Sequence, residues 1–278
     1  MNPQRRPPAL PFFLDTPQGK RFCLYHAPMP EHARPGAILY VHPFGDEMNL
    51  SRRMAALQSR EFAQAGYGVL QMDLFGCGDS DGDLRDATWE TWKEDLAAAA
   101  QWLRRHVSPV VTLWGLRLGA ALALDAVRSS SVTASQCILW QPVIDGKTWM
   151  TQFLRLALAA DMTERQAGRE NPRQALARGD TVEIGGYELA PALVAGIERI
   201  DLSGLRSIAP PLHWFELVPD DQTLVPAARI RTARDWADRN MDVRLHAVTG
   251  PSFWATREVT ECPGLIAETA GIFAEATA

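Results

Sequence analysis

The chain has 278 residues, of which 46% are hydrophobic and 22% are charged, and its formal net charge is −5. This composition is typical of a globular protein with enough apolar material for a core, and the acidic balance gives no support to a nucleic-acid-binding surface. No apolar run reaches the 18 residues of a membrane-spanning helix, the N-terminal stretch lacks the apolar core of a signal peptide, and the four cysteines are widely spaced. We therefore expect a soluble cytoplasmic protein with no transmembrane segment, and the sequence indicates no metal or cofactor.

Short apolar runs alternate with helical patterns in the first half of the chain. The runs predict strands at 21–27, 37–43, 68–74, 110–115 and 136–142, and the periodic segments predict helices at 49–66, 88–106 and 117–128. Thr88 is expected to cap the second of these helices. Continuous apolar strands that alternate with helices indicate a parallel sheet covered on both faces.

The alternation breaks between residues 146 and 205. This stretch contains an apolar helix candidate at 148–162, a polar segment at 163–180, a hairpin signal with Gly185 and Gly186 at its turn, and a second helix candidate at 190–200. Strands at 212–218 and 242–248 and helices at 224–239 and near 262–275 then resume the pattern. We expect one α/β domain spanning residues 1–278, with residues 146–205 inserted as a cap over the sheet.

The segment after the strand at 110–115 reads Gly-Leu-Arg-Leu-Gly at 115–119. A strand, a sharp Gly-x-x-x-Gly turn and a helix in this order resemble the nucleophile elbow of α/β-hydrolases, with Arg117 where the serine nucleophile stands. Segments 73–82, 217–226 and 246–254 resemble, in the same order, the superfamily's loop after an earlier strand, its acid-bearing turn and its histidine-bearing loop. The resemblance implies an α/β-hydrolase fold over roughly residues 20–275, with a mostly parallel sheet between two layers of helices and a cap insertion.

A narrower resemblance involves three short segments, at 42–54, 113–120 and 185–193. They are similar to the exosortase A system-associated hydrolase 2 family, whose elbow also reads Gly-Leu-Arg-Leu-Gly. This resemblance implies an association with the bacterial exosortase/PEP-CTERM sorting and exopolysaccharide system, and it implies that Arg117 is a regular feature of such proteins. The word hydrolase in that name rests on the fold.

The residues needed for hydrolysis by a serine triad are not all present. A guanidinium stays protonated at any working pH, so Arg117 cannot attack a carbonyl. The positions expected for the histidine hold Ser252 and Phe253, and His246 falls seven residues too early, within a predicted strand. The acid position remains open between Asp220 and Asp221, with Asp145 as a further candidate.

The backbone donors of this fold remain. The N–H of Leu118 would form one half of an oxyanion hole, and because Pro43 has no N–H, Phe44 or Gly45 would supply the other. A helix N-terminus favours anions. Adding Arg117 turns a site for a transient oxyanion into one suited to a stable carboxylate or phosphate.

Arg117 also needs a partner of its own. An arginine at a helix N-terminus is unfavourable by roughly 0.3–1 kcal/mol, so a nearby acid is expected to compensate it. Asp46 and Glu47 lie in the loop expected beside the elbow, and Asp221 lies on the acid turn. Glu47 has the longer reach, so we predict a Glu47–Arg117 salt bridge at about 2.7–3.2 Å, through one or both of its oxygens.

Two functions of different class remain open. In the first, the protein is a hydrolase or transferase with a non-standard constellation of Arg117, Glu47, His42 and Asp221. In the second, it is a catalytically inactive hydrolase fold that binds an anionic or acyl small molecule, or a partner protein. His42, Phe44 and Leu118 would then contact the ligand, although a packed His42 is the competing interpretation. The sequence leaves the substrate and the oligomeric state open.

Overall fold

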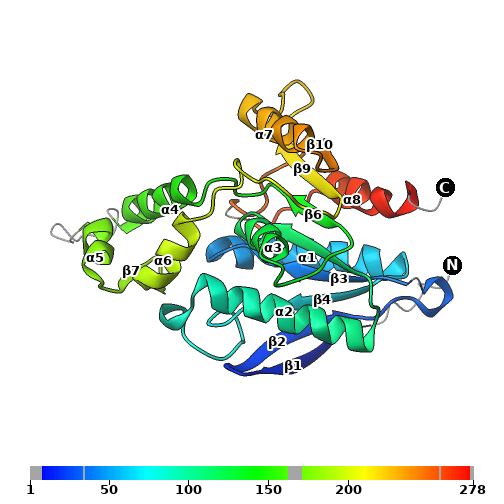
Figure 1. Ribbon diagram of the computed structural model, residues 1–278, viewed down its shortest axis with the longest axis horizontal. Helices are drawn as coiled ribbons and strands as arrows, with labels where there is room; N and C mark the ends of the chain where they lie inside the picture. Colours follow the sequence, from blue (N-terminus) through cyan, green and yellow to red (C-terminus); the bar gives the residue numbers. More distant parts are fainter. Residues whose placement is uncertain (1–7, 34, 162–170, 257, 276–278) are drawn as a thin grey trace.

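A sheet of eight strands forms the centre of the protein (Figure 1). The structure is a computed structural model, and it describes residues 8–33, 35–161, 171–256 and 258–275. The strands are, in spatial order, β1 (Leu10–Thr16), β2 (Gly19–His26), β4 (Gly68–Met72), β3 (Ala37–Val41), β5 (Val111–Leu116), β6 (Cys137–Trp140), β9 (Leu212–Val218) and β10 (Val243–Thr249). From β4 to β10 all pairs are parallel, whereas β1 and β2 form an antiparallel edge.

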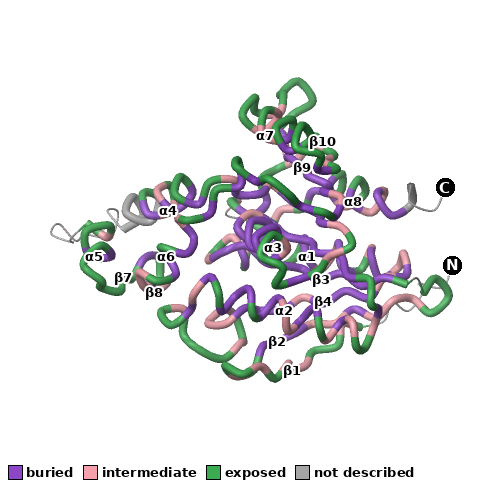
Figure 2. Tube along the Cα trace, in the orientation of Figure 1, coloured by how far each residue is buried: buried purple, intermediate pink, exposed green. Residues whose placement is uncertain are grey.

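Helices cover both faces of this sheet, because the side chains of a strand alternate between the faces. On β3, Ile38 and Tyr40 belong to the apolar cluster shared with α1 (Asp46–Gln64) and α8 (Pro263–Glu275). Leu39 and Val41 belong to the opposite cluster, shared with α2 (Trp89–His106), α3 (Leu118–Arg128) and α7 (Ala227–Asp238). Figure 2 shows the central strands as buried and β1 as exposed or intermediate. None of the described helices is long and apolar enough to cross a membrane.

The predicted α/β fold with a mostly parallel sheet is confirmed, with corrections at its edges. β1 was not predicted at all. Its residues Leu10 and Phe13 are half exposed, and Phe12 stacks on Trp102 of α2 with 4.8 Å between ring centroids. The helix predicted from residue 49 begins at Asp46, directly after the positive-φ residue Gly45. Thr88 caps α2 as expected, since its side chain accepts a hydrogen bond from Thr91 N at 3.0 Å.

The stretch between β6 and β9 lies at the left in Figure 1, apart from the helices that cover the sheet. It contains α4 (Gly146–Asp161), α5 (Pro172–Arg178), β7 (Val182–Ile184), β8 (Tyr187–Leu189) and α6 (Pro191–Glu198). The short strands β7 and β8 form the predicted hairpin, with Gly185 and Gly186 at its turn, both at positive φ. Residues 162–170, which include the start of the predicted polar segment, lie outside the described residues. Two short 3-10 helices, Pro30–His32 and Leu84–Asp86, complete the elements.

Candidate functional site

Arg117 occupies a sharp turn between β5 and α3. Its φ is 55° and its ψ is −117°, a left-handed conformation that non-glycine residues rarely adopt. Two backbone hydrogen bonds hold it there, because Arg117 N donates to Trp140 O at 2.9 Å and Val143 N donates to Arg117 O at 3.2 Å. The strand–turn–helix expected of a nucleophile elbow is present, with an arginine at its apex.

The glycines on either side of the turn allow close approach of the backbone. A Cβ on Gly115 would lie 2.4 Å from Ala120 Cα, and a Cβ on Gly119 would lie 2.3 Å from Val41 O. Both distances are far below van der Waals contact. The turn therefore requires glycine at both positions, and this requirement explains the Gly-x-Arg-x-Gly pattern.

The predicted salt bridge between Arg117 and Glu47 is confirmed. Arg117 Nε donates to Glu47 Oε1 at 3.2 Å, and the two side chains keep 17% and 22% of their surface exposed. The contact uses one carboxylate oxygen, and Glu47 Oε2 is buried without a hydrogen-bond partner among the described residues. Arg117 Nη1 and Nη2 likewise donate to no described residue. The pair thus leaves one edge of the guanidinium and one carboxylate oxygen free.

Trp254 covers the face of the same guanidinium. The Arg117 guanidinium carbon lies 5.4 Å from the centre of the Trp254 ring, within range of a cation–π interaction. Trp254 follows Phe253, which occupies the position expected for the histidine. Phe253 is fully buried and packs against Trp140 with 6.0 Å between ring centroids. The loop after β10 therefore supplies aromatic packing where a triad enzyme has its base.

A second carboxylate on which the charge of Arg117 acts was missed by the sequence analysis. Glu216 lies within β9 and is fully buried. Its Oε1 accepts from Trp214 Nε1 at 2.8 Å and lies 3.4 Å from Arg229 Nε, while its Oε2 has no partner among the described residues. The sequence feature that could have revealed Glu216 is its place as the one acidic residue in the apolar strand "LHWFELV".

Burial dominates the electrostatics of both carboxylates. It raises the pKa of Glu47, although the charge of Arg117 and its hydrogen bond act in the opposite direction. Burial also raises the pKa of Glu216, against the lowering effects of Arg229, Trp214 and Arg117. The charge of Arg117 thus favours the ionised form of both acids.

The other predicted contact residues line a small apolar cavity beside the elbow. His42, Phe44 and Leu118 surround it together with Trp89 and Trp92. Its volume is about 10 Å³, about the space one water molecule needs. Phe44 is buried and meets Trp149, Phe153 and Tyr187 at ring-centroid distances of 5.6, 5.3 and 6.2 Å. Phe44 thus links the cavity wall to aromatic residues of the segment between β6 and β9.

His42 is held by the backbone through both ring nitrogens. Nδ1 donates to Pro43 O at 2.7 Å, and Nε2 accepts from Leu74 N at 3.2 Å. Burial lowers the pKa of the His42 ring, so it is neutral near pH 7. This arrangement matches the packed histidine of the competing interpretation and leaves neither ring nitrogen free for a ligand. The N–H of Leu118, in contrast, has no acceptor inside α3, because it opens the helix.

The candidate acids of the sequence analysis lie away from Arg117. Asp221 is exposed and accepts from Thr249 Oγ1 at 2.5 Å, and no ion pair joins it to Arg117. Asp220 is exposed and accepts from Thr223 and Gln222 within its own turn. Asp145 accepts from Thr148 N at the start of α4. The structure therefore brings Glu47 to the elbow but not these three aspartates.

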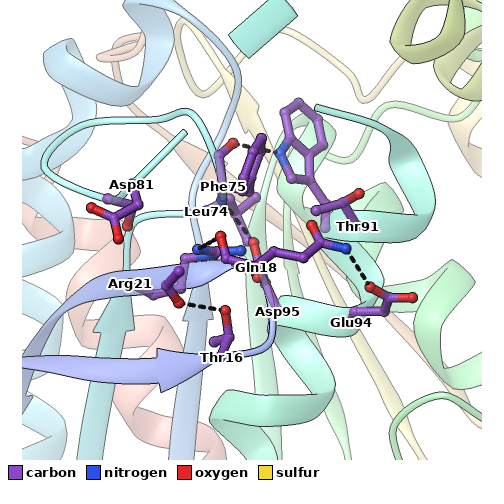
Figure 3. Close-up of polar contacts among 12 residues, drawn as sticks. Thr16, Gln18, Arg21, Leu74, Phe75, Asp81, Thr91, Glu94 and Asp95 are labelled. Carbon is purple, nitrogen blue, oxygen red and sulfur yellow. Dashed lines mark hydrogen bonds and ion pairs between the residues drawn. The ribbon is translucent and has the colours of Figure 1, made fainter. Parts of the chain in front are cut away.

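The loop that follows β4 lies next to the elbow and is fixed by a buried ion pair. Figure 3 shows Arg21 of β2 and Asp95 of α2 beside Phe75. Arg21 Nε donates to Asp95 Oδ1 at 2.7 Å, and Phe75 N donates to Asp95 Oδ2 at 2.7 Å. Burial raises the pKa of Asp95 to about 6. Burial and the nearby acids raise the pKa of Cys77, in the same loop, to about 12, so its thiol is protonated near neutral pH.

Part of the sequence matches a known enzyme family, and the whole fold matches solved structures. Residues 25–153 match the X-Pro dipeptidyl-peptidase (S15) family, a little under half of the chain. No curated protein matches the sequence. Among solved structures, Est1E from Butyrivibrio proteoclasticus with ferulic acid bound is 16% identical, with a TM-score of 0.66 over 95% of this chain and 98% of its own.

Two other solved structures have a similar fold over nearly the whole length of this chain. An α/β serine hydrolase without a lid from Xanthomonas campestris is 17% identical, with a TM-score of 0.59 over 98% of both chains. Proline iminopeptidase from Mycobacterium smegmatis is 15% identical, with a TM-score of 0.63 over 96% of this chain and 98% of its own. At such identities the likeness concerns the fold, and the chain has the fold of the α/β-hydrolase superfamily.

Proposed function

We propose that this protein binds an anionic small molecule, a carboxylate or a related oxyanion, at Arg117, and does not hydrolyse esters through a serine. One observation carries the proposal: the elbow presents a guanidinium whose Nη1 and Nη2 donate to no described residue, while Glu47 occupies only its Nε. The two Nη groups form a planar fork that fits two oxygens of a carboxylate or phosphate. The N–H of Leu118 at the start of α3 lies at the same turn and adds a donor for an anion.

The rival function is a hydrolase with a non-standard constellation of Arg117, Glu47, His42 and Asp221. The geometry gives it less support. Asp221 is exposed and bonded to Thr249, and both ring nitrogens of His42 are bonded to the backbone. Glu47 is the one member of the constellation that forms an ion pair with Arg117.

We also propose that the protein serves a bacterial exosortase and exopolysaccharide system, as the narrower resemblance implies. The segments that carry this resemblance contact each other at the elbow. Glu47 of the first segment pairs with Arg117 of the second, and Asp46 of the first accepts from Tyr187 Oη of the third at 2.9 Å. Because the three segments meet at one site, proteins that have all three are expected to bind a similar ligand there. All four cysteines are free thiols, which suits the predicted cytoplasmic location.

Calorimetric titration with sodium octanoate and with sodium sulfate tests the anion site. We expect Arg117→Gln to weaken binding about ten- to a hundredfold, since a hydrogen bond to a charged group contributes about 1.5–3 kcal/mol. Arg117→Lys keeps the charge but loses the fork, so it should not restore wild-type affinity. Arg128→Gln, on the surface end of α3 where Arg128 pairs with Asp125, is the matched control and should bind like the wild type.

Two results would contradict the proposal. The first is the absence of binding for both anions in the folded wild-type protein. The second is turnover of acyl esters, thioesters or phosphoesters that Arg117→Gln or Glu47→Gln abolishes while the unfolding midpoint stays close to that of the wild type. That second result would favour the non-standard hydrolase.

A further inference from the structure

The charge of Arg117 acts on two carboxylates, Glu47 and Glu216, and each of them has a buried oxygen without a partner among the described residues. Glu47 Oε2 and Glu216 Oε2 are buried and accept no hydrogen bond from any described residue. An ionised carboxylate that lacks donors is costly to bury, and a proton on the free oxygen removes that cost. The unpartnered oxygens therefore mark the two places at the elbow where a proton is most readily accommodated.

An anion at Arg117 would compete with Glu47 for the same charge. Glu47 holds the Nε edge at 3.2 Å, and the free edge is formed by Nη1 and Nη2 of the same planar group. A ligand on that edge brings a second negative charge next to the Glu47 carboxylate in a site where both side chains are mostly buried. Two like charges that share one partner in such surroundings do not both stay ionised, and one of them takes up a proton.

We propose that binding of an oxyanion at Arg117 is coupled to uptake of one proton by Glu47. The inference rests on the proposed anion site and specifies how that site is regulated. The proton comes from solvent and converts the Glu47 carboxylate into a carboxylic acid, so the net charge of the site is unchanged when the ligand is a monoanion. Glu47 thus acts as an internal counter-ion that a ligand displaces electrostatically, and its O–H becomes a donor in the occupied site.

The surrounding groups select Glu47 over Glu216 as the proton acceptor. Glu216 has a second cation in Arg229 and a donor in Trp214, whereas Glu47 has Arg117 alone. The charged and titratable groups near Glu47 come from five other places in the fold and from α1 itself: Tyr40 of β3, Arg117 of the elbow, Glu216 of β9, Arg229 of α7, Tyr187 of β8, and Asp46 of α1.

Apart from Glu216, the groups named above either keep one protonation state near neutral pH or are already bonded elsewhere. Burial raises the pKa of Tyr40, so its hydroxyl stays protonated. Asp46 already accepts from Tyr187 at 2.9 Å and makes no ion pair with Arg117. Burial lowers the pKa of Arg229, but it stays charged beside Glu216.

The direction of the pH effect follows from this coupling. Burial raises the pKa of Glu47 in the free protein, and a bound anion raises it further. Proton binding and anion binding therefore strengthen each other, so that the anion binds more tightly as pH falls. The affinity changes by up to tenfold for each pH unit between the free and the liganded pKa of Glu47.

Direct measurement of the proton tests the proposal. Sodium sulfate is titrated into weakly buffered protein held at pH 6.5, and the acid needed to hold the pH is recorded beside the binding curve; sulfate itself does not titrate there. The wild type should take up a fraction of a proton, at most one, for each sulfate bound. Glu47→Gln should take up none and should bind sulfate more tightly at pH 7.5, by about tenfold for each pKa unit that the ligand adds to Glu47.

Asp46→Asn is the matched control, because it removes one negative charge from the adjacent residue and keeps an acceptor for Tyr187. It should retain the wild-type proton uptake. Sulfate binding by the wild type without proton uptake would overturn the coupling and leave the anion site standing. Uptake that persists in Glu47→Gln but is lost in Glu216→Gln would overturn the assignment to Glu47. A complete lack of sulfate and octanoate binding would overturn the anion site itself.

Discussion

At the scale of single residues, Arg117 combines two unfavourable features that the surrounding structure compensates. A non-glycine residue in the left-handed region costs about 1–3 kcal/mol, and a cation at a helix N-terminus opposes the helix dipole. Backbone hydrogen bonds from Arg117 N to Trp140 O and from Val143 N to Arg117 O stabilise the strained turn. The ion pair with Glu47 and the cation–π contact with Trp254 stabilise the charge of the guanidinium. In a hydrolase this turn presents a nucleophile, and here the same turn presents a cation.

Replacing the cation with a hydroxyl should not create an esterase. We expect Arg117→Ser to hydrolyse p-nitrophenyl acetate no faster than a protein-free control, because Phe253 is fully buried and both ring nitrogens of His42 are bonded to the backbone. A fluorophosphonate probe should leave both the wild type and the variant unlabelled. Labelling of the variant at position 117 would show that a base does reach the turn.

Glu216 gives a pH dependence of stability that differs from that of an ordinary surface acid. Its pKa is raised in the folded state, so its contribution to stability is fully present below the pKa of the unfolded chain and is lost as pH rises through the folded-state pKa. The uncharged Glu216→Gln should therefore gain in free energy of unfolding, relative to the wild type, between pH 5 and pH 8. The gain is about 1.4 kcal/mol for each unit by which the pKa is raised.

Urea unfolding at four pH values between 5 and 8 measures this gain. Glu188→Gln, at an exposed acid paired with Arg85, is the control and should differ from the wild type by a constant amount. If the difference between Glu216→Gln and the wild type is also constant over this range, the raised pKa of Glu216 is wrong.

At the scale of elements, the site depends on how closely α3 approaches β3. Leu118 and the buried alanines of α3 lie within the apolar cluster of that face, and the approach is closest at Gly119, where the helix backbone meets the end of β3. A methyl group there would meet Val41 O at 2.3 Å and His42 O at 2.4 Å, and these are backbone atoms that cannot rotate away. The position of the elbow is therefore determined by a helix–strand contact as well as by the turn.

Gly119→Ala should consequently destabilise the protein by at least the 1–3 kcal/mol typical of overpacking. Gly271→Ala in α8 is the matched control, since a Cβ there meets nothing within 4 Å. That change should stabilise the protein by about 0.5–1 kcal/mol, the difference in helix preference between the two residues. Thermal unfolding of both variants gives the comparison, and equal effects would contradict the close approach.

At the scale of the whole molecule, the parts that could be predicted are those that local sequence determines. β3 to β6 are continuous buried runs, so their pattern indicates a parallel sheet. β1 was missed because its order depends on pairing with β2 and on the stacking of Phe12 on Trp102, 90 positions away in the chain. The sequence predicts Glu47 as the partner of Arg117, because its loop lies beside the elbow in the chain order of the fold and its side chain is long enough to reach. Glu216 was missed because the cations that act on it, Arg229 and Arg117, are distant in the chain and act on it only in the folded protein.

The segment between β6 and β9 is expected to open more easily than the sheet. Near the elbow it is attached by the Tyr187–Asp46 hydrogen bond, by aromatic contacts of Phe44 and by an exposed Arg85–Glu188 ion pair at 3.1 Å. The segment also buries Met150, Leu189, Leu193 and Ile197 in the apolar cluster that it shares with the sheet. At the hairpin turn, however, Gly185 and Gly186 are exposed, exposed ion pairs contribute little, and exposed backbone opens locally at lower free energy than a core. The Tyr187 hydrogen bond therefore contributes one part of the attachment of the hairpin.

Hydrogen exchange of Tyr187→Phe tests that expectation. Loss of one hydrogen bond costs about 0.5–1.5 kcal/mol, so amide exchange in the hairpin Val182–Leu189 should accelerate about two- to tenfold. Exchange in β3 and β5 should stay unchanged, because those strands are completely buried. Tyr67→Phe, which removes a hydroxyl from a ring that packs on Phe273 away from the hairpin, is the control and should leave hairpin exchange as in the wild type. Equal acceleration in the hairpin and in β5 would mean that the segment and the sheet open as one unit, which would contradict the local opening expected here.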